Sequence, residues 1–153
     1  MNDLSDELHT LIQKLIDTHG EFGICPTRAD WTAILKCPAD KPLNVLNLLQ
    51  FKPEVATPQG TVSGQTAYGH YVADVGPAFA RAGGKSLYHG KVNHMFGTVA
   101  GPDWHVAILT QYPTPLALAN FWLDPEFVAA HSHRVHGVEQ SRVLVMNSLR
   151  GGY

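Results

Sequence analysis

Apolar residues near the start of the chain recur at the spacing of an amphipathic helix. Leucines and isoleucines stand three and four residues apart from Leu4 to Ile16, and Gly20 follows the last of them. This spacing predicts a helix of about four turns that ends at the glycine. After a loop, Thr27 is a suitable N-cap for a second, shorter helix. We therefore expect residues 1–40 to form a helical extension and not a separate domain.

The pattern changes after residue 41. Residues 43–51 are a nearly continuous apolar run, interrupted by Asn47 and Gln50, and such runs are typical of strands buried on both faces. Residues 53–64 are rich in Pro, Gly, Ser and Thr, which predicts a loop. From Gln65 the apolar positions again follow helical spacing, up to a Gly-Gly pair at 83–84.

The second half of the chain predicts three further strands and a helical segment. The strands cover about residues 85–96, 104–112 and 141–147. Between the last two strands, Thr114-Pro115 and Asp124-Pro125 each place a good N-cap before a proline, which predicts the starts of two consecutive helices. Residues 150–153 are expected to be a short tail.

The element order after residue 41 is strand, helix, strand, strand, helix, strand. This order predicts an α+β fold, a ferredoxin-like βαββαβ protomer over residues 41–149, with a four-stranded antiparallel sheet and helices on one face. The strands are apolar on both faces, so the open face needs a cover. A second copy of the sheet in a two-fold homodimer would provide it.

The composition agrees with one domain that buries surface in an assembly. The chain has 153 residues, of which 44% are hydrophobic and only 16% charged, whereas about 25% charged is typical of soluble domains. The formal net charge of -2 provides no basic surface, so we expect no nucleic-acid partner.

Other sequence features bear on localisation and on thiol chemistry. The acidic start lacks the basic and apolar regions of a signal peptide, and no apolar run is long enough to span a bilayer. We expect a cytoplasmic protein without a membrane partner. Cys25 and Cys37 are then reduced thiols, and no base near either in sequence marks it as a nucleophile.

Histidine is unusually frequent. The chain holds nine histidines, and seven lie between His70 and His136. Neutral imidazole is a common metal ligand, and His133 and His136 can share a helix face. No HExxH pattern or cysteine pair accompanies them, so we predict no metal site and no cofactor. Metal- or haem-dependent chemistry is kept as an alternative that metal analysis would test.

A small set of polar and aromatic residues predicts a ligand pocket between sheet and helices. An arginine facing a cleft can hold a carboxylate with two hydrogen bonds, and an adjacent histidine can transfer a proton. Each residue also has a purely structural alternative: Arg134 can tie helix to strand, Asn47 can bond a loop backbone, and Trp104 can pack in the core. The candidate ligand-binding residues are Asn47, Tyr71, His89, Trp104, His133 and Arg134. The sequence marks no residue as catalytic.

A family resemblance rests on an ordered set of motifs. They are 47–52 (NLLQFK), 63–68 (SGQTAY), 75–77 (VGP), 83–84 (GG), Trp104, 112–113 (YP), 124–127 (DPEF), 133–134 (HR) and 141–142 (SR). In this set the chain resembles the uncharacterised domain of unknown function 1330 family of the dimeric α/β-barrel superfamily. The resemblance covers about residues 41–149 and implies a ferredoxin-like protomer whose two-fold dimer forms a barrel, but it implies no established reaction. The chain departs from the family pattern at Gln50, His105 and Phe127.

Three functions are compatible with these observations. The first is binding of a small organic molecule, acidic or aromatic, in the pocket. The second is a cofactor-independent monooxygenase or isomerase-like enzyme, by analogy with superfamily relatives. The third is a non-enzymatic structural or regulatory dimer module. A cavity lined by the candidate residues would favour the first over the third.

Overall fold

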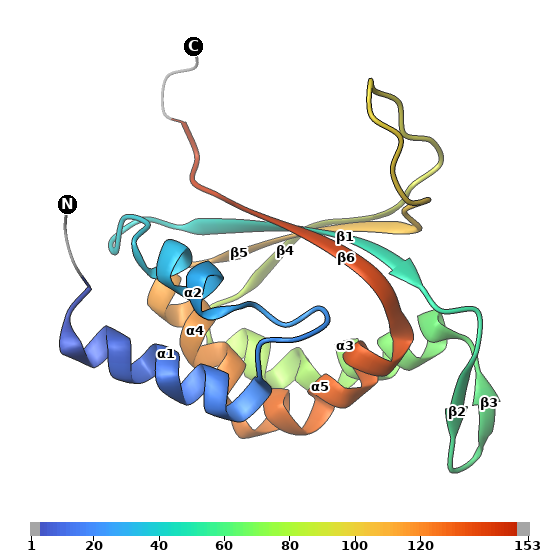
Figure 1. The fold of residues 1–153 in the computed structure, drawn as a ribbon, viewed down its shortest axis with the longest axis horizontal. Coiled ribbons are helices and arrows are strands. Elements are labelled where there is room, and N and C mark those ends of the chain that lie inside the picture. Colours follow the sequence, from blue (N-terminus) through green and yellow to red (C-terminus); the bar gives the residue numbers. More distant parts are fainter. Residues whose placement is uncertain (1–3, 150–153) are drawn as a thin grey trace.

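A four-stranded antiparallel sheet carries helices on one face (Figure 1). The computed structural model describes residues 4–149, so the expected tail at 150–153 lies outside the described residues. The strands of the sheet, in the spatial order β4-β5-β1-β6, are β4 (Lys85–Lys91), β5 (Val106–Tyr112), β1 (Leu43–Phe51) and β6 (Val138–Met146). Helix α3 (Gly64–Arg81) connects β1 to β4, and helices α4 (Pro115–Leu123) and α5 (Pro125–Gly137) connect β5 to β6.

This topology confirms the α+β, ferredoxin-like fold that the sequence predicts. Alternate residues of β1, among them Leu43, Val45 and Leu49, are buried beneath the helices. The intervening residues face the other side, where the strand register aligns side chains of all four strands. One such row runs, in order, through Tyr88, Leu109, Leu46 and Leu144. The sheet is therefore apolar on both faces, as expected.

The connecting helices begin where the sequence predicts. Thr114 and Asp124 are the N-caps of α4 and α5, and their side chains accept hydrogen bonds from the amides of Ala117 and Glu126. Each helix has proline at its first position, where a missing N–H costs no hydrogen bond. These local devices fix the helix starts independently of the tertiary structure.

The N-terminal extension packs on the same chain. Helices α1 (Asp6–His19) and α2 (Arg28–Leu35) bury Ile12, Leu15 and Trp31 in the same core cluster as the sheet and α5. The Nε2 atom of His19 lies 2.7 Å from the carbonyl oxygen of Trp122, which joins α1 to α4. The apolar stripe of the first helix is thus buried within the protomer.

Three segments differ from the expectation: one contains an unexpected hairpin, and two strands have other bounds. The segment 53–64 is not wholly a loop, because it contains a hairpin of β2 (Val55–Thr57) and β3 (Gly60–Val62). Gly60 allows the tight turn with a φ of 122°, a conformation that favours glycine. Strand β6 begins at Val138, three residues earlier than expected.

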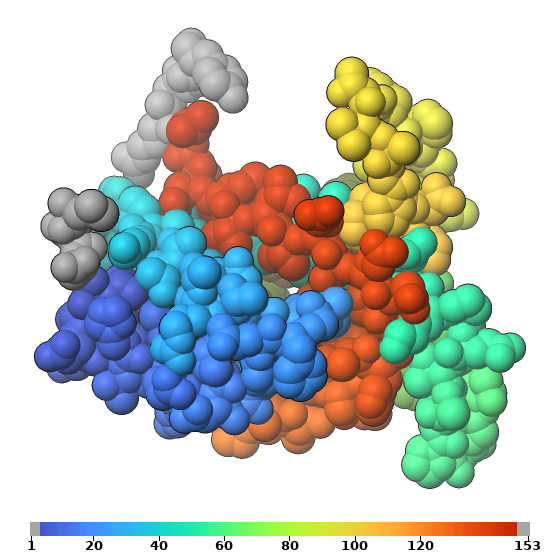
Figure 2. All heavy atoms as spheres, in the orientation of Figure 1, coloured from blue at the N-terminus to red at the C-terminus, as the bar shows by residue number. Residues whose placement is uncertain are grey.

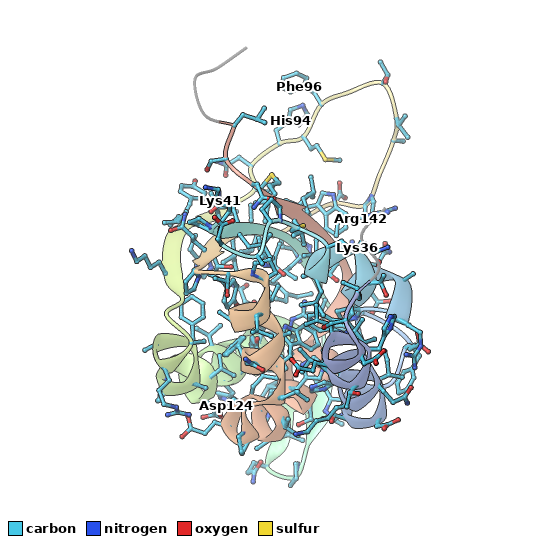
Figure 3. The ribbon with its side chains drawn as sticks, turned by 90° about the vertical axis from the view of Figure 1, so that its left-hand side faces the viewer. Lys36, Lys41, His94, Phe96, Asp124 and Arg142 are labelled. Atoms are coloured by element: carbon cyan, nitrogen blue, oxygen red, sulfur yellow. The ribbon has the colours of Figure 1, made fainter. Side chains whose placement is uncertain are left out.

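Strand β4 also ends early, at Lys91, and a long loop follows it. Val92 donates to the carbonyl oxygen of His105 at 3.0 Å and closes this loop at its base. Figure 3 shows His94 and Phe96 of the loop beyond the sheet, on the side away from the helices and Asp124. None of the helices within residues 4–149 has both the length and the apolar character needed to cross a membrane.

Candidate functional site

A cavity of about 790 Å³ lies between the sheet and the helices. Strands β1, β5 and β6 form its floor, α3, α4 and Arg134 of α5 lie opposite the sheet, and the N-terminal extension forms one side. Figure 2 shows the surface on this side of the molecule, where the extension packs beside α5 and β6. The lining includes Cys25, Trp31, Val45, Asn47, Tyr68, Tyr71, Val75, Ile108, Thr110, Tyr112, Phe121 and Arg134.

Arg134 is the buried charge in this lining. It lies on α5 and is 5% exposed. Its Nη1 atom has no hydrogen-bond partner among the described residues. Burying a guanidinium costs free energy when one of its N–H groups loses its hydrogen bond to water and finds no protein acceptor in its place. An anion entering the cavity would supply the missing acceptor.

Three buried tyrosines surround this part of the cavity. Burial raises the pKa of Tyr68, Tyr71 and Tyr112, and the positive charge of Arg134 partly opposes the rise in each case. The rings of Tyr68 and Tyr71 are 5.3 Å apart, centroid to centroid. All three phenols remain protonated at neutral pH, so they can donate hydrogen bonds to a ligand.

Two further candidates lie on the sheet. Asn47 is on the helix-facing side of β1, paired with Ile108 of β5 and Val143 of β6, and it lines the cavity. His89 pairs with Ile108 on the edge strand β4 and lines the cavity with its side chain exposed. Together with Tyr71 and Arg134, four of the predicted site residues therefore share one cavity.

The other two candidates do not line the cavity. Trp104 is buried, at 8% exposed, in the segment before β5. His133 lies 3.8 Å from a carboxylate oxygen of Asp74 on α3, outside the cavity. Adjacent helical residues point about 100° apart, and here Arg134 points into the cavity while His133 points toward Asp74 of α3. Sequence adjacency to Arg134 does not place His133 in the cavity.

The sequence analysis did not find the polar pair Cys25 and His131. The Sγ atom of Cys25 is 3.5 Å from Nε2 of His131, and His131 is 6% exposed. Burial, together with the charge of Arg134 and the nearby His19, lowers the pKa of His131 to about 3. One signal was available, since His131 precedes Arg134 by three residues and so shares its helix face. No sequence signal pointed to Cys25.

The metal alternative gains no support from the geometry. Among residues 4–149, no group of three or more His, Cys, Asp and Glu side chains is placed to hold a metal ion. The cavity has aromatic and aliphatic walls and a few polar groups, a lining that small-molecule sites commonly share.

Comparisons with known proteins place the chain in a family. No curated protein matches it. The crystal structure of RPA0582, a protein of unknown function from Rhodopseudomonas palustris, is 30% identical with a TM-score of 0.74 and covers 82% of this chain and 95% of its own. The methylated RPA0582 protein is also 30% identical, with a TM-score of 0.77 and coverage of 86% and 98%.

A third solved structure is more distant. It is a dimeric protein of unknown function and ferredoxin-like fold from Bacteroides fragilis NCTC 9343, 12% identical with a TM-score of 0.47, covering 72% of this chain and 100% of its own. In sequence, residues 57–148 match the family described as Domain of unknown function (DUF1330). This range is more than half of the chain, and the chain therefore belongs to the DUF1330 family.

Proposed function

We propose that this protein binds a small organic carboxylate, with an aromatic or other apolar body, in the cavity between sheet and helices. The observation that carries the proposal is the buried guanidinium of Arg134, whose Nη1 atom has no partner among the described residues. The planar guanidinium matches a carboxylate, since the two can form a pair of parallel hydrogen bonds.

The rest of the lining suits such a ligand. Tyr68 and Tyr71 lie on the same side of the cavity and interact with Arg134, so their phenols can donate to the same acid group. Trp31, Phe121 and Ile108 offer apolar surface for its body. The volume of about 790 Å³ falls within the range of small-molecule sites. A filled interior would have favoured a purely structural module, so the cavity supports the binding role.

We further propose that the protein works as a homodimer joined through the open face of the sheet. Tyr88 and Leu144 on this face are 60% and 45% exposed. Phe96, in the loop that projects from the same side, is 91% exposed (Figure 3). A monomer rarely leaves so large an apolar surface in water, and a second copy of the sheet would cover it.

Thermal-shift measurements test the ligand. Benzoate and phenylpyruvate should raise the melting temperature with increasing concentration, whereas benzamide, which is uncharged, should not. Arg134→Met should abolish the shift caused by the acids. Arg81→Met is the matched control, since Arg81 lies on the surface and pairs with Asp124 and Glu126 away from the cavity. If Arg134→Met binds the acids as well as the original protein does, Arg134 is not the anchor.

A further inference from the structure

The loop before α2 brings a thiol into the cavity wall. Cys25 is half-buried and lines the cavity, and its Sγ atom lies 3.5 Å from Nε2 of His131 on α5. The two residues are 106 positions apart in sequence. Only the packing of the N-terminal extension against α5 creates this pair.

The pair is uncharged at rest. Burial raises the pKa of the Cys25 thiol, although the charge of Arg134 partly opposes the rise. The low pKa of His131, about 3, keeps the imidazole neutral. A neutral imidazole with its ring proton on Nδ1 can accept the thiol proton at Nε2. At a pKa of about 3 this imidazole is a weak base, and a carboxylate bound at Arg134 would strengthen it, because it offsets the charge that helps to lower the pKa of His131.

Arg134 completes the group. It follows His131 by one turn on the same face of α5 and lines the cavity as Cys25 does. Two polar atoms of this group, Nδ1 of His131 and Nη1 of Arg134, are buried and have no hydrogen-bond partner among residues 4–149. A thiol, a base behind it and an unpaired anion anchor thus converge on one part of the cavity.

We propose that Cys25 is a nucleophile for small carboxylic acids that carry an electrophilic carbon, with His131 accepting the thiol proton and Arg134 holding the carboxylate. The role of Arg134 rests on the proposed function, whereas the thiol chemistry goes beyond it. The Cys25 thiol should react slowly with uncharged reagents, because they form no ion pair with the guanidinium of Arg134. An acid held at Arg134 is kept beside the thiol and gains from proximity.

The chemistry balances without an oxidant or a cofactor. With iodoacetate, the Cys25 sulfur forms a bond to the methylene carbon, iodide leaves with the electron pair of the C–I bond, and the thiol proton passes to His131. With a 2-oxo acid, the sulfur adds to the carbonyl carbon. The π electrons move to the carbonyl oxygen, which takes up the proton, and the addition is reversible.

Alkylation of the full-length protein tests the proposal. Iodoacetate and its neutral counterpart iodoacetamide are compared by mass spectrometry of the peptides that contain Cys25 and Cys37. Cys37 is the internal control: it also lines the cavity, but its thiol donates to the carbonyl oxygen of Ala33, 3.6 Å away, whereas Cys25 contacts His131 and lies within the field of Arg134. The rate ratio of iodoacetate to iodoacetamide should be at least about tenfold higher at Cys25 than at Cys37, as expected for one charge-assisted anchor.

Variants separate the roles. Arg134→Met should remove the preference for iodoacetate at Cys25, and Arg134→Lys should restore part of it by returning the charge. His131→Phe should slow both reagents at Cys25 and leave their ratio high; His131→Asn serves the same purpose if the larger ring disturbs folding. If the rate ratio of iodoacetate to iodoacetamide is the same at Cys25 and Cys37 in the original protein, the proposal is overturned.

The two proposals fail in different ways. Benzoate should protect Cys25 from iodoacetate, since both acids need Arg134. If benzoate raises the melting temperature but Cys25 shows no preference for iodoacetate, the binding function stands and the thiol site is wrong. If benzoate neither binds nor protects while the preference depends on Arg134, the thiol site stands and a larger apolar acid is not the ligand.

Discussion

At the scale of single residues, polar groups in the cavity wall and directly behind it are buried at a cost to folding. Arg134 and His131 each have a buried nitrogen without a partner among the described residues. Arg134 also keeps its positive charge next to the imidazole and helps to lower the pKa of His131. Groups that cost stability in this way are commonly found at functional sites, where a ligand satisfies them.

The buried histidine predicts a pH dependence of stability. His131 has an ordinary pKa of 6.5 when unfolded and about 3 in the folded protein. Below pH 6.5 the unfolded chain binds a proton that the folded protein does not, so the folded state loses stability as the pH falls toward 3. The loss from this group between pH 7 and pH 5 is about 2 kcal/mol. Urea unfolding at the two pH values measures it.

His131→Phe is the comparison variant for this pH effect. The imidazole stacks on Phe127, with ring centroids 5.1 Å apart, so a phenyl ring can take its place in the aromatic cluster. Between pH 7 and pH 5, the free energy of unfolding should fall by about 2 kcal/mol less in the variant than in the original protein. The remaining histidines are common to both proteins and cancel in the difference. Equal losses would show that His131 is not buried in its neutral form.

At the scale of elements, α3 and α5 meet through backbone where two glycines face each other. A Cβ atom on Gly64 would lie 2.3 Å from the carbonyl oxygen of Gly137 and 2.5 Å from that of Lys52. Gly64 also donates to the Lys52 carbonyl at 2.9 Å. This close approach sets how α3 leaves the sheet, and thereby where Tyr68 and Tyr71 enter the cavity.

We therefore expect Gly64→Ala to destabilise the protein by about 1–3 kcal/mol, because the backbones must move apart to admit the methyl group. Gly69→Ala is the matched control on the same helix, where a Cβ would have no neighbour within 4 Å. There the helix propensity of alanine should raise stability by up to about 1 kcal/mol. Chemical denaturation of both variants measures the contrast. Similar effects in the two would contradict the close contact.

At the scale of the whole molecule, the exposed sheet face is the feature that one protomer leaves without a partner. The row of Tyr88, Leu109, Leu46 and Leu144 crosses all four strands on the face opposite the helices. The same face bears the projecting loop that contains Phe96 (Figure 1). The cavity lies on the other side of the sheet, so the proposed dimer formation and the proposed ligand binding would use separate surfaces.

This arrangement predicts that Leu144→Lys, on the edge strand β6 of the open face, yields a monomer. A charge in an apolar interface loses water without gaining a partner, which opposes association. Val128→Lys is the control, since Val128 is 39% exposed on α5, in the helical layer. Light scattering should give the mass of two chains for the control and of one chain, 16.7 kDa, for Leu144→Lys. A dimer in both would place the interface elsewhere.

The fold was largely predictable because its signals are local. Helical spacing, the N-caps Thr114 and Asp124 and the apolar run of β1 each depend on neighbours within a few residues. The hairpin of β2 and β3 was missed because its two short strands lie in a Gly- and Pro-rich segment that lacks an apolar pattern. Loop composition alone does not distinguish such a hairpin from an irregular loop.

The candidate site was predictable only in part. Asn47 is a polar residue in an otherwise apolar strand, and that mismatch identified it, whereas Arg134 was identified by its place in the His-Arg motif and by the carboxylate chemistry of arginine. Trp104 and His133 do not line the cavity with them, because motif membership does not specify the direction of a side chain. The pairing of Cys25 with His131 joins segments 106 residues apart, and no local pattern encodes such a contact.

The amino-acid sequence by itself determined the order of strands and helices and the ferredoxin-like topology, because spacing and capping act over short distances. Tertiary structure alone decided which polar side chains share the cavity. The orientation of α5 points Arg134 into the cavity and His133 toward Asp74, and packing of the N-terminal extension places Cys25 against His131. Such contacts depend on how distant segments pack, and the spacing of residues along the chain does not determine that packing.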